Sequence, residues 1–324
     1  MFVSAELTAW LDDPQRQVDA REAADEFMKR WTSRAGVREL QHDLRSLKIR
    51  TADSVLAAAR RFMSRTDEFR DLLRDFSAAA ADNPFFRPHF LLLASDVATS
   101  ILLYADPDVT VSMGVTSADA LAAKKSGGRG SGSIAFSGLR SVFHFLKSGN
   151  ATLTIWEAPE SGDTFADDQG GHCRLVERRR IADGETLALD GRTQSFVIEH
   201  ATSDMVYIQA EALVDRAPLA VEYDDRTLDL VGATSTDEVS SRTQMMASLL
   251  RLMGRKDAAP VIARLIERAP FYARWYLTRE LLALDVEAAL PVLGRLAEAD
   301  PHPEVRATAA QTLALFFGED EAAA

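Results

Sequence analysis

Three histidines lie in the middle of the chain, and a thiol and a carboxylate accompany one of them. His144, His172 and His200 are spaced 28 residues apart, with Cys173 and Glu177 near the second. Such groups hold zinc or iron where the fold brings them together. A histidine in a β domain is more often a surface or hydrogen-bonded residue. We therefore expect no cofactor. The candidate ligands of a transition metal, iron or zinc, are His144, His172, His200 and Glu177.

Cys173 is the only cysteine, and it follows His172 directly. A nucleophilic thiol needs a base within hydrogen-bond reach, but adjacent side chains on a regular strand point to opposite faces. We therefore expect Cys173 to be a small buried apolar residue. No Gly-x-Ser-x-Gly motif is present, so a Ser/His/Asp arrangement cannot be inferred.

The region from 134 to about 231 has the pattern of short strands separated by turns such as Asp190-Gly191. Many short strands at close spacing indicate an antiparallel sandwich or barrel. By alternation we expect Trp156 and Phe196 to face inward as core aromatics. The expected strands are 142–146, 151–156, 173–181, 186–189, 195–200, 205–212 and 219–223.

Residues 184–196, GETLALDGRTQSF, resemble the second motif of the cupin family. In that motif a glycine opens a short strand, a turn follows, and a metal-holding histidine begins the next strand. Here Gln194 or Ser195 takes the histidine position, and no His-x-His occurs in the chain. The resemblance implies a cupin-like jelly roll over 134–231 that lacks the usual metal ligands. Such a domain would act as a small-molecule pocket or a second interaction surface.

Residues 1–81 are predicted to form a helical region, rich in Ala, Leu, Arg and Glu. The residues spaced for a buried stripe are Phe27, Trp31, Leu40, Leu44 and Leu47. Thr51 and Asp53 occupy positions typical of helix caps. Two prolines within 82–88 cannot continue a helix, so they end this region.

Segment 82–133 is expected to connect the helical region to the β domain. It should contain a buried helix at 90–104, a strand at 109–115 and a short helix at 117–125. The glycine-rich run 126–133 closes it. A phosphate-binding P-loop needs a lysine after its glycines, whereas Lys124 and Lys125 precede these. We interpret the run as a flexible loop, with a phosphate cradle as the alternative.

The C-terminal region repeats with a period of 32 residues. The residues at this spacing are Arg242, Arg274 and Arg306, and likewise Leu249, Leu281 and Leu313. Each leucine follows its arginine by two helical turns and should belong to the core. The run from Asp300 to Ala310, DPHPEVRATAA, resembles a HEAT repeat. The resemblance covers 237–317, implies a helical solenoid with a protein partner, and leaves 318–324 as an acidic tail.

Four aromatic residues open one helix of this repeat. Phe271 and Trp275 share one face, while Tyr272 and Tyr276 share another. One pair should be core. We take Tyr272 and Tyr276 as candidate anchors for a partner, with buried packing as the alternative.

The formal net charge of −12 disfavours nucleic acid and anionic membranes as partners. One cysteine, the lack of a signal-peptide pattern and the lack of a long apolar run favour the cytoplasm.

The predicted fold class is α+β multidomain: an N-terminal helical region, a central antiparallel cupin-like sandwich or barrel, and a C-terminal HEAT-like α-solenoid. We expect an adaptor that binds a protein or peptide and has a possible small-molecule ligand. The alternative is a cupin-like metal-dependent oxygenase or isomerase, or a component of a peptide-modifying enzyme, with the solenoid holding the substrate. The sequence leaves the reaction, ligand, partner, pathway and oligomeric state open.

Overall fold

The computed structural model describes residues 5–126, 132–160 and 171–317, and the chain divides into two compact units. The first unit comprises Met1–Ile134, Leu139–Glu157 and Arg174–Arg216. The second comprises Ala135–Gly138, Ala158–Cys173 and Ala217–Ala324. The chain passes between the units several times, so neither is one continuous stretch. Most of the glycine-rich run 126–133 and the tail 318–324 lie outside the described residues.

Five helices open the first unit, and capping side chains fix where two of them begin. Asp13 accepts hydrogen bonds from two backbone amides at the start of the second helix. Thr51 and Ser54 form a capping box at the start of the fourth, which confirms the cap expected at Thr51. Asp53 lies in the first turn rather than at the cap. The helices are α1 (Ala5–Leu11), α2 (Pro14–Thr32), α3 (Ala35–Ser46), α4 (Ala52–Met63) and α5 (Thr66–Asp82).

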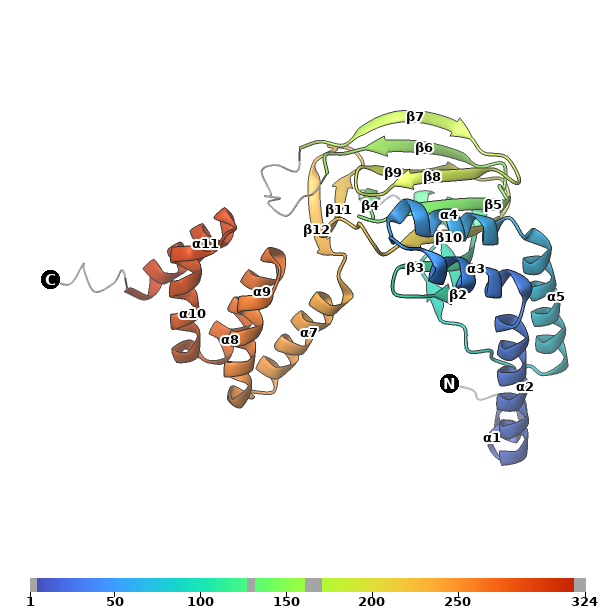
Figure 1. Ribbon diagram of the computed structural model, residues 1–324, viewed down its shortest axis with the longest axis horizontal. Coiled ribbons are helices and arrows are strands. Elements are labelled where there is room, and N and C mark those ends of the chain that lie inside the picture. Colours follow the sequence, from blue (N-terminus) through green and yellow to red (C-terminus); the bar gives the residue numbers. More distant parts are fainter. Residues whose placement is uncertain (1–4, 127–131, 161–170, 318–324) are drawn as a thin grey trace. The chain divides into compact units, whose positions relative to one another are not determined.

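A six-stranded antiparallel sheet follows, in the order β1-β2-β3-β10-β5-β8 (Figure 1). Its strands are β1 (Leu92–Ala94), β2 (Ala98–Ala105), β3 (Val109–Thr116), β10 (Met205–Ala212), β5 (Arg140–Lys147) and β8 (Thr186–Asp190). The helix predicted at 90–104 is wrong, because this segment forms β1 and β2. Pairing with β3 satisfies the backbone N–H and C=O groups of β2. The local sequence of 90–104 does not indicate this pairing. The predicted strand at 109–115 and helix at 117–125 are confirmed as β3 and α6 (Ala118–Ser126).

The N-terminal helices cover one face of this sheet (Figure 1). Along β10, Ile208, Ala210 and Ala212 are fully buried in the same cluster as α4. Trp31 of α2 reaches the sheet and donates its indole N–H to the carbonyl oxygen of Leu103 at 3.0 Å. Burial of these apolar groups is the main force that joins helices to strands.

A three-stranded sheet, in the order β7-β6-β9, supplies the other part of the first unit's β structure. Its strands are β7 (Arg174–Arg180), β6 (Thr152–Glu157) and β9 (Gln194–His200). Leu153, Ile155 and Phe196 pack with Phe143 and Phe145 of β5. Two antiparallel sheets in contact agree with the predicted sandwich, but β1, β2 and β3 come from outside the predicted range 134–231, and β4 and β11 belong to another sheet.

Trp156 corrects one expectation about that sandwich. Since Leu153 and Ile155 take the inward positions of β6, alternation turns Trp156 away from them. Its side chain is half-buried and donates a hydrogen bond to the Thr154 hydroxyl. Phe196 is partly buried in the core, as predicted, with its ring centroid 5.0 Å from that of Phe143.

The second unit contains a small sheet and the C-terminal helices. The sheet has the order β12-β11-β4, with β4 (Ser133–Phe136), β11 (Leu219–Asp224) and β12 (Leu230–Ser235). Phe136 and Tyr223 are buried and pack edge to face. The helices are α7 (Glu238–Leu252), the 3-10 helix η2 (Lys256–Ala258), α8 (Ala259–Arg268), α9 (Phe271–Leu284), α10 (Val286–Ala299) and α11 (Pro303–Phe317).

The three leucines of the 32-residue period differ in burial. Leu281 of α9 is fully buried, and Leu313 of α11 is partly buried against the same cluster. Leu249 of α7 is 56% exposed, so its expected core position is wrong. α7 packs on α9 through its other side, where Ala247 is buried. In the described part of the chain, we find no helix with the length and apolarity needed to span a membrane.

Candidate functional site

The four candidate metal ligands lie on separate elements. His144 is on β5, where its ring nitrogen lies 3.1 Å from the Thr186 hydroxyl and burial lowers its pKa. His200 ends β9 and Glu177 lies on β7, with β6 between the two strands. His172 belongs to the second unit. Among the described residues, no three His, Cys, Asp or Glu side chains come together as a metal site requires.

His172 and Cys173 point to different environments, as strand alternation predicted. His172 is 70% exposed, and its Nδ1 lies 2.9 Å from the Asp229 carboxylate. Cys173 is 1% exposed, and burial raises the pKa of its thiol. A thiol of this kind is a weak nucleophile. The interpretation of Cys173 as a small buried apolar residue is confirmed.

The cupin-like segment connects the two sheets of the first unit. Gly184 adopts a φ of 81°, a left-handed conformation that favours glycine, just before β8. The turn at Asp190 then leads into β9, where the side-chain Oε1 of Gln194 accepts a hydrogen bond from the backbone amide of Asp190 at 3.3 Å. Ser195 is buried. Gln194 therefore stabilises the turn at the position where the cupin motif has a histidine.

A row of polar side chains follows β10 on the face opposite the helices. Tyr207, Gln209 and Glu211 alternate with the three buried apolar residues that face α4. Tyr207 packs against Phe143 and Phe145, the core aromatics between the two sheets. The three residues, which we call the β10 polar row, therefore face the interior of the sandwich.

Hydrogen bonds and burial set the chemistry of the β10 polar row. The amide of Gln209 donates to the Glu211 carboxylate at 2.9 Å. Burial raises the pKa of Glu211, and a weaker opposing effect comes from Gln209. Burial also raises the pKa of Tyr207, which hydrogen-bonds Thr116. A raised pKa favours the protonated form of an acid, and burial therefore shifts both Glu211 and Tyr207 in that direction.

Strand β3 provides the neighbours of this row. Thr110, Ser112 and Gly114 lie opposite Glu211, Gln209 and Tyr207 in register. A Cβ atom at Gly114 would lie 2.7 Å from the Tyr207 ring, so glycine makes room for the phenol. The sequence pattern predicted only a strand over 205–212 and did not single out these residues as a site. The one available signal was alternation of polar with apolar residues, which ordinary half-buried strands also show.

The candidate anchors Tyr272 and Tyr276 lie at the start of α9. Tyr276 is 36% exposed, and its hydroxyl lies 2.7 Å from that of Ser248 on α7. Tyr272 is half-buried, with its ring edge-on to Phe271. Phe271 stacks on the buried ring of His302 at 4.3 Å. The prediction that the tyrosines contact a partner stays a prediction.

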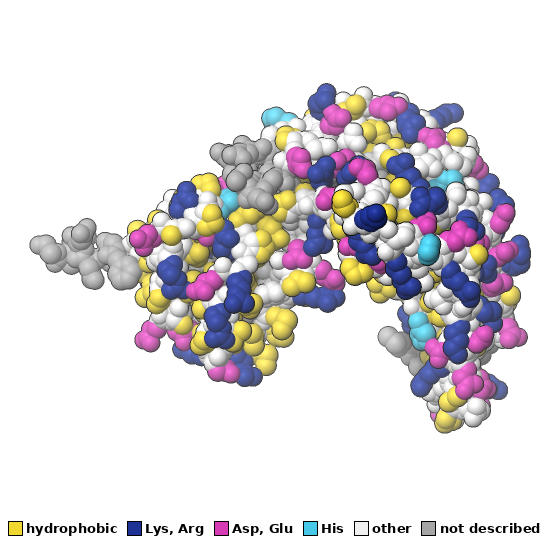
Figure 2. All heavy atoms as spheres, viewed as in Figure 1, with side chains coloured by type: hydrophobic (Ala, Val, Ile, Leu, Met, Phe, Trp, Pro, Cys, Tyr) yellow, Lys and Arg dark blue, Asp and Glu magenta, His cyan; other side chains and the backbone are white. Residues whose placement is uncertain are grey.

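A larger apolar surface lies beside Tyr276, on α7. Its side chains, which we call the α7 apolar face, are Val239, Met245, Met246, Leu249, Leu252 and Met253. Each is between 56% and 72% exposed. Their spacing places them on one side of the helix, opposite buried Ala247. Figure 2 shows apolar side chains gathered over this helix.

No protein-family model matches the chain, and no curated protein matches it. Solved structures give weak matches. Ectoine synthase from P. lautus is 13% identical with a TM-score of 0.23, over 37% of this chain and 67% of its own. A cupin domain from Bordetella pertussis Tohama I is also 13% identical with a TM-score of 0.23, over 37% and 97%. KdgF from Halomonas sp. is 10% identical with a TM-score of 0.22, over 38% and 85%.

These matches cover little more than a third of the chain. Similarity this weak transfers no activity, substrate or metal to it. The site must therefore be judged from its own residues.

Proposed function

We propose that the chain is an adaptor whose helices α7–α11 bind a helix of a partner protein, and whose first unit holds a small ligand at the β10 polar row. The observation that carries the adaptor role is the α7 apolar face. Monomeric proteins rarely leave a contiguous apolar surface of more than a few hundred Å² in water, and such surfaces mark interaction sites. Six large apolar side chains, each more than half exposed, form one here.

The occupant that suits this face is a helix with an apolar stripe. In HEAT-like arrays each helix pair covers the apolar side of the next, and α7 has no preceding pair. The nearby cations are already paired, since Arg242 contacts Glu238 and Arg251 contacts Glu280. Methionine side chains adapt to varied apolar partners. Apolar packing rather than charge would therefore select the partner.

The β10 polar row supports the ligand role of the first unit. Its amide, phenol and shielded carboxyl groups suit a neutral, hydrogen-bonding molecule such as a sugar. Ligand-detected NMR with a panel of neutral sugars tests this. Saturable binding of at least one sugar that is lost in Ser112→Leu supports the role. Binding of none, or equal binding by the variant, contradicts it.

The adaptor role is tested by capture followed by titration. Proteins retained by the full chain from a lysate of its host are identified, purified and titrated. The double variant Met246→Glu/Leu249→Glu should bind the purified partner at least tenfold more weakly, because it places charge on the apolar contact. Val286→Glu is the matched control, since Val286 is an exposed apolar residue on α10.

Two outcomes contradict the proposal. One is equal affinity of the wild type and the α7 double variant for the purified partner. The other is a dimer, measured by sedimentation, that the double variant abolishes, since the face would then be occupied by a second copy. Tyr272→Ala/Tyr276→Ala should also weaken binding with a nearly unchanged Tm, as expected for side chains that border the contact.

A further inference from the structure

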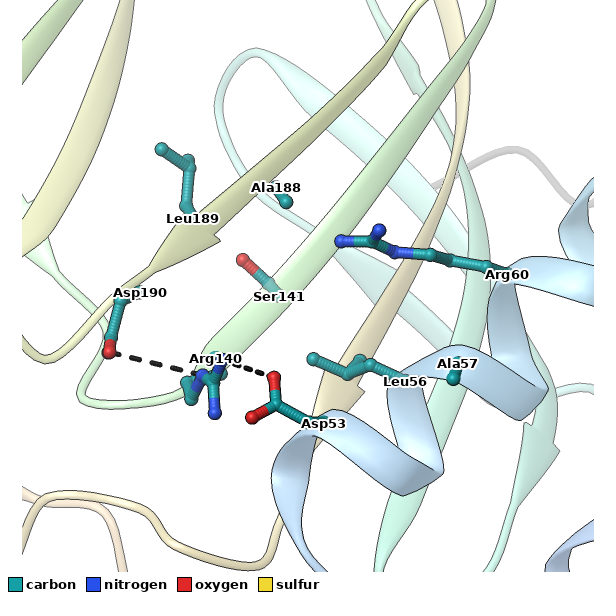
Figure 3. A pocket seen from close by; sticks show the side chains of 9 residues that line it. All are labelled: Asp53, Leu56, Ala57, Arg60, Arg140, Ser141, Ala188, Leu189 and Asp190. Carbon is teal, nitrogen blue, oxygen red and sulfur yellow. Dashed lines mark hydrogen bonds and ion pairs between the residues drawn. The ribbon is translucent and has the colours of Figure 1, made fainter.

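A groove lies on the first unit, beside α4 and along β5 and β8, with a volume of about 310 Å³. Helix α4 contributes Asp53, Leu56, Ala57 and Arg60, and the strands contribute the remaining walls. Figure 3 shows the Arg60 side chain extending from α4 toward β5, while Arg140 lies next to Asp53. The β10 polar row is not part of this groove, so the groove is a separate place on the unit.

Both carboxylates at the groove already have cationic partners. Asp53 accepts a hydrogen bond from Arg140 at 2.5 Å, and this bond lowers the pKa of Asp53. Asp190 accepts two hydrogen bonds from Arg192, at 2.8 and 2.7 Å, and these lower the pKa of Asp190. Arg140 also lies 3.9 Å from Asp190. The carboxylates therefore stay ionised and are neutralised by these two arginines.

Arg60 differs in its contacts from Arg140, the other arginine that lines the groove. Among the described residues, its guanidinium group has no hydrogen-bond or ion-pair partner, although its charge also acts on Asp53. It is exposed, and it lies over the groove rather than away from the protein (Figure 3). Two arginines and two aspartates line the groove, so the lining is balanced in formal charge. Because Arg140 is engaged with Asp53, the guanidinium of Arg60 is the cation of the lining that is open to an anionic group of a ligand.

Apolar atoms form the rest of the lining. Leu56, Ala57, Ala188 and Leu189 line the groove together with Ser141. Ala57 and Ala188 are exposed small residues, which leave the space open. Ligand pockets begin at roughly 300 Å³, so the groove fits a small molecule rather than a peptide.

We propose that this groove binds a small organic monocarboxylate. The carboxylate lies between Arg60 and Arg140, where guanidinium groups form paired, charge-assisted hydrogen bonds. The apolar part of the ligand covers the alanine and leucine side chains. A bare inorganic anion would leave that apolar lining unused.

Calorimetric titration of the full chain with hexanoate tests the proposal. Hexanoate should bind saturably, with a Kd on the order of 1 mM or below. Arg60→Gln should weaken binding at least tenfold, and Ala57→Phe should weaken it as strongly by filling the groove while keeping every charge. Arg61→Gln is the matched control. It removes the same charge from the next residue of α4, where Arg61 pairs with Asp43.

Several outcomes would overturn the proposal. They are absence of saturable hexanoate binding to the wild type, equal losses in Arg60→Gln and Arg61→Gln, and unchanged binding in Ala57→Phe. Tighter binding of inorganic phosphate than of hexanoate would also overturn it, because the site would then select the charge and not the organic body. Melting curves of each variant show whether it is folded, and the exposed positions of Arg60 and Ala57 make this the expected result.

Discussion

The two helical regions of this chain differ in what covers their apolar side chains. Helices α2–α5 place Phe27, Trp31 and Phe69 against a sheet, and all three side chains are buried. Helices α7–α11 form a core with one another, centred on Leu281 and Leu293. In the first region α4 packs directly on the sheet, and α2 reaches the sheet through Trp31. In the second, the first helix α7 keeps one apolar side uncovered.

The difference shows that an apolar stripe on a helix specifies a need for a partner and not the partner itself. Where strands supply that partner, the apolar stripe becomes part of a hydrophobic core. On α7, where no described strand packs on the apolar side chains, the same pattern is exposed to solvent. Truncation of Trp31 in the first region, and of Leu281 and Leu249 in the second, tests this contrast.

Trp31→Ala should cause the largest loss of stability, about 3–5 kcal/mol, because it empties a buried site between α2 and the sheet. Trp31→Phe should cost less, since it keeps a ring and loses the hydrogen bond to the Leu103 carbonyl. Urea unfolding of the full chain measures both. A loss below about 1 kcal/mol for Trp31→Ala would show that the sheet does not support these helices.

Leu281→Ala and Leu249→Ala compare two positions of the same repeat. Leu281 is fully buried, so its truncation should cost about 2–5 kcal/mol. Leu249 is 56% exposed, so its truncation should change stability by no more than about 0.5 kcal/mol. The same unfolding experiment applies. Equal losses would mean that α7 is covered like α9, and the interaction surface proposed on α7 would be withdrawn.

Asp183→Asn should have the smallest effect, confined to acid. The backbone amide and hydroxyl of Ser148 and the ammonium of Lys147 lower the pKa of Asp183 from 3.8 to about 2. A depressed pKa stabilises the fold above pH 3.8, and the contribution is lost as pH falls through about 2. The variant should therefore lose less stability than the wild type between pH 4 and pH 2. An identical pH slope would contradict this, and Asp67→Asn, at a 91% exposed carboxylate, is the control.

Local sequence patterns predicted much of the secondary structure. Alternation and turns located β5 to β11, and the Thr51 cap located the start of α4. The prediction of a helix at 90–104 was wrong because an apolar run of this length fits a buried helix or a buried strand equally well. The pairing of β2 with β3 decides in favour of the strand, and the local sequence does not show that pairing.

The candidate sites were less predictable than the fold. His144, His172 and His200 attract attention by residue type, yet the structure places them on separate elements. Glu211 and Arg60 are common residue types in unremarkable stretches. Their chemistry comes from burial beside Gln209 in one case and from a groove between distant segments in the other.

The sequence determined the positions of β5 to β11 and the capped start of α4, and that Cys173 would be buried while its neighbour was not, because caps, turns and alternation act over a few residues. Only the tertiary structure decided which apolar stripes are covered, that Glu211 has a raised pKa, and that Arg60 and Arg140 share a groove. Those properties depend on groups that lie far apart in the chain and meet only after the sheets and helices have packed.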